Sequence, residues 1–208
     1  MTVLPGNAIV RPNRYICNIS CLPHSLHDRT ELDSHADTCV AGSNFALLWD
    51  PVPGRTVSIY GYNGGKAAHT SVPIATVCTT YQHPDTGVEY LLVVHEALYL
   101  GEQVPCSLLN PNQLCAHGIT VHDTPVQFDP KSSHSVHAFT EQGDPVNIPL
   151  TMNGVMSGFH STLPTHDDVR TLPRVFLTAD MPWDPKSSKF ADAEEHARRV
   201  SSISPCTC

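Results

Sequence analysis

Between residues 32 and 126 the sequence alternates short runs of β-branched and aromatic residues with turn-forming residues. The runs fall at Thr56–Tyr60 and at residues 72–81, 88–97 and 118–122, with glycine, proline, asparagine or aspartate between them. The 208 residues include 18 prolines and 12 glycines, and only 15% are charged. The pattern therefore predicts an all-β domain of about six to seven strands and excludes an all-α bundle.

Two helices interrupt this pattern in the prediction. Residues 111–117 start with a proline after Asn110 and end at Gly118, which indicates one short helix inside the β domain. Near the C-terminus, Asp184 and Pro185 precede apolar residues at helical spacing, namely Phe190, Ala193, Ala197 and Val200. A short terminal helix is expected there.

The sequence divides into three parts. Residues 1–29 form an irregular N-terminal extension, with one strand expected at residues 15–19, and residues 30–126 form the β domain. Residues 127–208 are a C-terminal spacer or extension, in which residues 136–139 and 146–152 can pair as a hairpin. No second fold and no internal repeat is evident.

Charge and hydropathy exclude several classes of protein. Twelve lysines and arginines against 20 acidic residues give a net charge of −8, which repels phosphate backbones and anionic lipid surfaces. The longest apolar stretch, residues 90–94, is far shorter than a membrane span, and the first ten residues lack an export signal. We therefore expect a cytoplasmic protein whose eight scattered cysteines are mostly reduced, with no nucleic-acid and no membrane partner.

An acidic segment at residues 31–40 is the most informative part of the chain. Asp33 and Ser34 stand just before an apolar run, and taken alone they also suit an ordinary turn. Downstream, a glycine-rich segment at residues 61–65 lies between two β runs, as the tip of a hairpin would. Farther on, Leu108 and Leu109 lead through Asn110 into the predicted short helix.

In this order the motifs resemble a retropepsin-type aspartic protease, most closely the protease segment of copia-type long-terminal-repeat retrotransposon polyproteins. The resemblance covers roughly residues 30–126 and implies a retropepsin-like acid protease barrel with one short helix. It makes Asp33 the catalytic aspartate and Ser34 the hydroxyl that braces the paired loops. It assigns substrate binding to the loop residues His35, Ala36 and Asp37 and to the flap residues Gly61, Tyr62, Asn63, Gly64 and Gly65.

The chemistry of this family requires two carboxylates on either side of one water molecule. Held about 3 Å apart, the two groups cannot both ionise, so they share a proton and act as base and acid in turn. The resemblance therefore implies a homodimer that cleaves polypeptides, above all its own polyprotein, in the virus-like particle of a retroelement. It implies no cofactor.

A second copy of the motif is spelled by Asp85, Thr86 and Gly87. It lies between two β runs, where Asp-x-Gly forms a hairpin turn, whereas a catalytic loop should follow a buried apolar strand. We therefore expect Asp33 to meet Asp33 of a second chain.

Two positions depart from the family pattern. His35 stands where the family usually has glycine, and Asn110 replaces the glycine that follows the apolar pair. A folded but inactive relative, serving as a dimeric structural or binding segment, is therefore the main alternative. Catalysis by Cys39 or Cys115 with a histidine is disfavoured because neither cysteine has a recognisable nucleophile context.

A zinc-binding module is the second alternative. Thiolates and imidazoles are the usual zinc ligands, and the best spacing for such a site is that of Cys17, Cys21, His24 and His27. This spacing matches no established zinc motif, so the prediction for metal is none.

Overall fold

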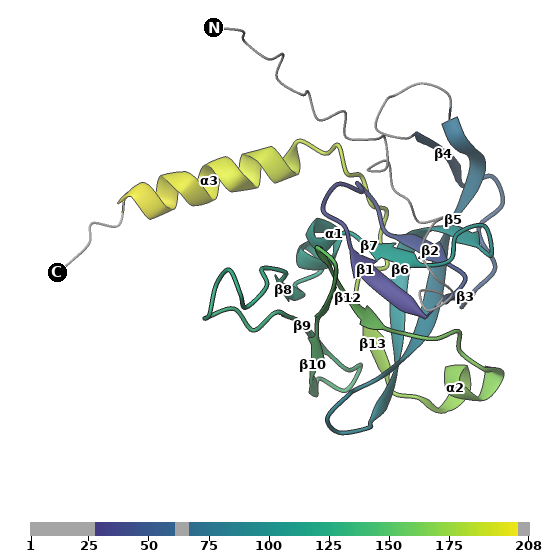
Figure 1. Ribbon diagram of the computed structural model, residues 1–208. Coiled ribbons are helices and arrows are strands. Elements are labelled where there is room, and N and C mark those ends of the chain that lie inside the picture. The colour runs from purple at the N-terminus through teal and green to yellow at the C-terminus, as the bar shows by residue number, and fades with distance from the viewer. Residues whose placement is uncertain (1–27, 61–66, 204–208) are drawn as a thin grey trace, which may run out of the picture.

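The computed structural model describes residues 28–60 and 67–203. As expected, the chain is mostly β-structure (Figure 1). The strands are β1 (Arg29–Leu32), β2 (Val40–Gly42), β3 (Ala46–Leu47), β4 (Thr56–Tyr60), β5 (Ala67–Gln82), β6 (Glu89–Gly101), β7 (Ser107–Leu109), β8 (Thr120–His122), β9 (Ser135–Phe139), β10 (Pro145–Pro149), β11 (Thr151–Asn153), β12 (Met156–His160) and β13 (Arg174–Phe176). The helices are α1 (Pro111–Ala116), α2 (His166–Thr171) and α3 (Lys189–Ile203). The strand expected at residues 15–19 and the hairpin tip lie outside the described residues.

The larger sheet brings together strands that are far apart in the sequence. Its order is β11-β12-β1-β7-β2-β6-β5-β3, with β13 on β6 and β4 on β5. β1 pairs in parallel with β7 and antiparallel with β12, and β2 pairs antiparallel with β7 and in parallel with β6. No closed barrel forms within residues 28–60 and 67–203.

The long hairpin of β5 and β6 ends at the second aspartate motif. The backbone N–H groups of His83 and Gly87 close the turn onto Val88 and His83 respectively, each at 2.8 Å. Gly87 has a φ of +70°, a conformation that glycine adopts without a steric penalty. The hairpin-turn interpretation of Asp85-Thr86-Gly87 is thus confirmed, and the motif is exposed to solvent.

A smaller sheet, β10-β9-β8, packs its apolar residues into the same core as the larger one. The predicted hairpin of residues 136–139 with 146–152 is confirmed as far as Pro149 by the register of β9 and β10, whereas residues 151–153 form β11 and pair with β12 instead. Val136, Ile148 and Val175 are almost completely buried in the cluster that holds Leu92 and Leu109. The packing therefore continues across residue 126, where the sequence predicts a domain boundary.

The chain forms more elements than its β runs predict, because several are only three residues long and gain their stability from neighbours. β12 has five residues and also depends on a neighbour, since a Cβ at Gly158 would collide with the backbone carbonyl of Thr30 in β1. Only glycine lets the two strands approach this closely. Across residues 28–60 and 67–203, the helices lack the length and apolar character needed to cross a lipid bilayer.

Candidate functional site

The segment after β1 is positioned by the parallel pairing of β1 and β7. Leu32 and Leu109 lie opposite each other, and the backbone N–H of Asp33 donates to the carbonyl of Leu109 at 3.0 Å. Because the carboxyl ends of parallel strands meet at one edge of a sheet, the loop of residues 33–38 lies beside the start of α1. We call this segment the Asp33 loop.

Asp33 itself is partly accessible. Its side chain is 25% exposed, and its Oδ1 accepts the backbone N–H of His35 at 2.8 Å. The His35 imidazole is 94% exposed, with Nδ1 3.8 Å from the same oxygen. Ser34 and Asp37 are also exposed. The loop thus presents a carboxylate and a hydroxyl that another molecule can reach.

Beneath the Asp33 loop, a buried set of polar side chains joins β1, β7 and the residue that follows β12. The Asn44 amide donates to Thr30 Oγ1 at 3.0 Å and to Ser161 Oγ at 2.9 Å, and its Oδ1 accepts from Ser107 Oγ at 2.6 Å. All four residues are nearly inaccessible to solvent. The network fixes the strand that carries Asp33 relative to the strand that supports it.

α1 holds the Asp33 loop from its other side. Asn110 caps the helix by accepting the backbone N–H of Gln113 at 2.9 Å, and its amide donates to the carbonyl of Ala36. Gln113 Oε1 accepts the backbone N–H of Cys39 at 2.9 Å. The asparagine that departs from the family pattern therefore supports the loop through its own side chain.

Replacing Asn110 with alanine should lower the free energy of unfolding by about 1–2 kcal/mol, because the helix loses its N-cap and the Ala36 carbonyl loses its donor. Urea unfolding measures this change. Asn112→Ala is the matched control, since Asn112 is exposed in the same helix. Equal losses in the two variants would contradict the role given to Asn110.

β4 precedes the glycine-rich segment and β5 follows it, and the two strands pair as a hairpin. Ile59 pairs with His69, and Tyr60 pairs with Ala67. The proposed flap residues Gly61, Tyr62, Asn63, Gly64 and Gly65 lie outside the described residues. The body of the hairpin packs on β2 and β6 through a cluster that includes Val57, Val72 and Leu98.

Glu96 connects this hairpin to the C-terminal part of the chain. Arg55, just before β4, donates to both Glu96 oxygens, at 2.7 and 2.5 Å, and the backbone N–H of Trp183 donates to Oε2 at 3.2 Å. Burial alone would raise the pKa of Glu96, but the hydrogen bonds from Arg55 and Trp183 outweigh it and lower the pKa. Glu96 has a φ of +56°, so this carboxylate is held at some conformational cost.

Trp183 in turn contacts the Asp33 loop. Its indole N–H donates to the carbonyl of Asp37 at 2.9 Å, and its ring packs against Phe190 with centroids 5.3 Å apart. A groove of about 590 Å³ lies between these two rings, the loop residues 34–37 and the α1 residues Cys115 and Ala116. The loop is therefore bordered by an apolar groove.

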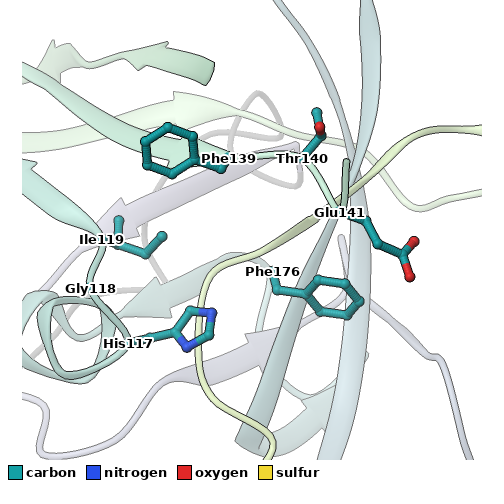
Figure 2. Close-up of a pocket in the computed structure, with 7 residues that line it drawn as sticks. All are labelled: His117, Gly118, Ile119, Phe139, Thr140, Glu141 and Phe176. Carbon is teal, nitrogen blue, oxygen red and sulfur yellow. The ribbon is translucent and has the colours of Figure 1, made fainter. Parts of the chain in front are cut away.

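A second cavity, of about 310 Å³, lies at the other end of α1. Figure 2 shows His117, Ile119, Phe139 and Phe176 around it, while the carboxylate of Glu141 extends away from these side chains. Burial lowers the pKa of His117. This cavity brings together fewer reactive groups than the Asp33 loop, so we take the loop as the candidate site.

The described structure gives little support to catalysis by Cys39 or to a metal site, whereas Cys115 is exposed beside the groove. Cys39 is buried, and burial raises the pKa of its thiol to about 12, so it does not form a nucleophilic thiolate near neutral pH. No group of three or more metal-ligating side chains occurs within residues 28–60 and 67–203. Cys17, Cys21, His24 and His27, the ligands of the alternative zinc module, lie outside the described residues.

The sequence prediction missed Trp183 and Gln113, which bond to the backbone of Asp37 and Cys39, and Asn44, which ties β1 to β7. Trp183 gave one available signal, since an aromatic residue between Pro182 and Asp184 in a polar segment needs a surface to pack on. Asn44 gave none, because its partners lie 14 to 117 positions away in the sequence.

Comparisons with protein-family models, with curated proteins and with solved structures found no match to this chain.

Proposed function

We propose that this chain is the aspartic endopeptidase segment of a copia-type retrotransposon polyprotein, active as a homodimer with a retropepsin-like fold. The observation that carries the proposal is the placement of Asp33. It follows a buried strand, it is tied to the parallel strand β7 through Leu109, and its carboxylate stays 25% exposed. The motif at Asp85 also follows a largely buried strand, but it lies in the exposed turn that joins the antiparallel strands β5 and β6.

The mechanism follows from pairing two such carboxylates across a twofold axis. The pair shares one proton, so the ionised member takes a proton from a water molecule while the other donates its proton to the scissile carbonyl. The water oxygen bonds to the carbonyl carbon; the peptide bond then breaks as the carboxyl that took the water proton gives it to the leaving nitrogen, and the other carboxylate takes a hydroxyl proton of the intermediate. One chain supplies one such carboxylate, so neither subunit alone has a complete site.

The other loop residues would brace the site or bind the substrate. Ser34 would steady the paired loops through its hydroxyl. His35, Ala36, Asp37 and the hairpin tip at residues 61–65 would hold the substrate backbone. The substrate would be a polypeptide, first of all the polyprotein itself, processed inside a cytoplasmic virus-like particle. No step needs a metal or a cofactor.

An inactive dimeric segment is the second candidate. It is favoured by the hydrogen bond from the His35 backbone N–H to Asp33 Oδ1, because the same geometry occurs in ordinary Asx turns. Such a protein would dimerise without cleaving peptides at any pH from weakly acidic to neutral.

A mixing experiment tests the shared site. A threefold excess of the Asp33→Asn chain should reduce the cleavage rate of a fixed amount of parent chain to about a quarter, because most parent chains then pair with a subunit that lacks the carboxylate. The substrate is a peptide covering residues 125–170. The same excess of Asp85→Asn should instead raise the rate. An unchanged rate with Asp33→Asn would contradict a site built from two chains.

A further inference from the structure

α3 extends away from the two sheets (Figure 1). Its residues 189–200 are all exposed, and Phe190 and Val200 are 42% and 52% exposed. Isolated helices of about 15 residues are marginally stable in water, so most protein helices gain stability by packing one face. This surface is therefore a candidate for a contact outside the chain.

The apolar residues of α3 form one stripe. At about 100° per residue, Phe190, Ala193, Ala197 and Val200 fall within about 80° of the helix circumference. The stripe is symmetric about Glu195, because two of its residues lie 5 and 2 positions before Glu195 and the other two lie 2 and 5 positions after it. Two copies that cross antiparallel at Glu195 would set Phe190 opposite the partner's Val200 and Ala193 opposite the partner's Ala197. The alanines would allow the two backbones to approach closely.

The charges of α3 fit the same arrangement. The first half carries Asp192, Glu194 and Glu195 after an initial lysine, and the second half carries His196, Arg198 and Arg199. Within the chain, Arg198 pairs with Glu194, and Arg199 pairs with Glu195. An antiparallel pair places the acidic half of each helix beside the basic half of the other, whereas a parallel pair places like charges together.

α3 also starts close to the Asp33 loop, because Phe190 lines the groove that Ser34 and Asp37 border. A stripe this short buries less area than the roughly 1,200 Å² of a typical stable interface. Two contacts made by one pair of chains reinforce each other, since the first raises the effective concentration for the second.

We infer that α3 is a dimerisation helix, whose Phe190-Ala193-Ala197-Val200 stripe packs antiparallel on the same stripe of a second copy. The inference rests on the proposed homodimer for the existence of a pair of chains, and it names the surface that holds them together.

The first test compares two aspartates on the same helix, in the full chain, by sedimentation equilibrium. Ala193→Asp places a carboxylate in the stripe and should weaken dimerisation at least about tenfold, because packing the apolar stripe would remove water from the charge. Ala191→Asp lies about 140° from the centre of the stripe and should change dimerisation less than about twofold. Circular dichroism checks that both variants keep the helix. Equal effects of the two variants, or a monomeric parent chain, would overturn the inference.

A second test uses the charges. An α3 with basic residues beside the stripe (Asp192→Lys, Glu194→Lys) and one with acidic residues there (His196→Glu, Arg198→Glu) should each dimerise poorly alone and regain dimerisation when mixed. Failure to recover on mixing would overturn the pairing of the two halves.

Different results would overturn the protease proposal and the α3 pairing. Asp33→Asn should remain dimeric through α3 although it has lost cleavage. Retained cleavage in Asp33→Asn would overturn the protease proposal and leave α3 pairing intact. Unchanged dimerisation in Ala193→Asp would overturn α3 pairing and leave the protease proposal intact.

Discussion

Replacing Asp33 with asparagine should reduce cleavage of a precursor that carries residues 125–170 by a factor of about 100 or more, the contribution expected of a group that transfers protons in the transition state. Asparagine keeps the shape of the side chain and can still accept the His35 backbone N–H at Oδ1. The variant should therefore fold as the parent chain does. Cleavage is followed by gel electrophoresis and by mass spectrometry of the products.

The control for this prediction is Asp85→Asn, which makes the same substitution within the exposed Asp-Thr-Gly turn. Because that turn connects β5 to β6 and lies on the surface, cleavage should stay within about twofold of the parent rate. Equal cleavage by the parent and Asp33→Asn would rule out Asp33 as a catalytic residue. Loss of cleavage in Asp85→Asn alone would transfer that role to the turn.

The second large effect is expected at Asn44. Asn44→Ala removes the common partner of Thr30, Ser107 and Ser161, all of them buried, and should lower the free energy of unfolding by about 3 kcal/mol. The cost arises because hydroxyls that cannot reach water lose a hydrogen-bond partner. Chemical denaturation followed by circular dichroism measures the change.

Asn147→Ala is the matched control, because Asn147 is exposed on β10 and the substitution is the same. Its free energy of unfolding should stay within about 0.5 kcal/mol of the parent value. If Asn44→Ala were equally mild, the polar network would not be what fixes β1 against β7.

Features encoded by neighbouring residues could be predicted from the sequence. The short helix after Asn110 is confirmed because its proline start and glycine end are local signals. The turn at Asp85 and the hairpin of β9 and β10 are confirmed for the same reason. The terminal helix is confirmed from the spacing of its apolar residues.

Features that depend on distant partners could not be predicted. Residues 154–168 look irregular in the sequence, yet β12 pairs with β1, because Gly158 permits an approach that no local pattern reveals. The side chains that support the Asp33 loop also depend on distant partners. The effect of Asn110 depends on the Ala36 carbonyl, and that of Trp183 on the Asp37 carbonyl 146 positions away.

The pairing of two Asp33 side chains is the central claim, and an experimental structure of the assembled protein at weakly acidic pH tests it most directly. We expect a twofold dimer in which the two Asp33 carboxylates lie within hydrogen-bonding distance and share one water molecule. A dimer in which the two Asp33 loops face away from the twofold axis would contradict the proposed mechanism.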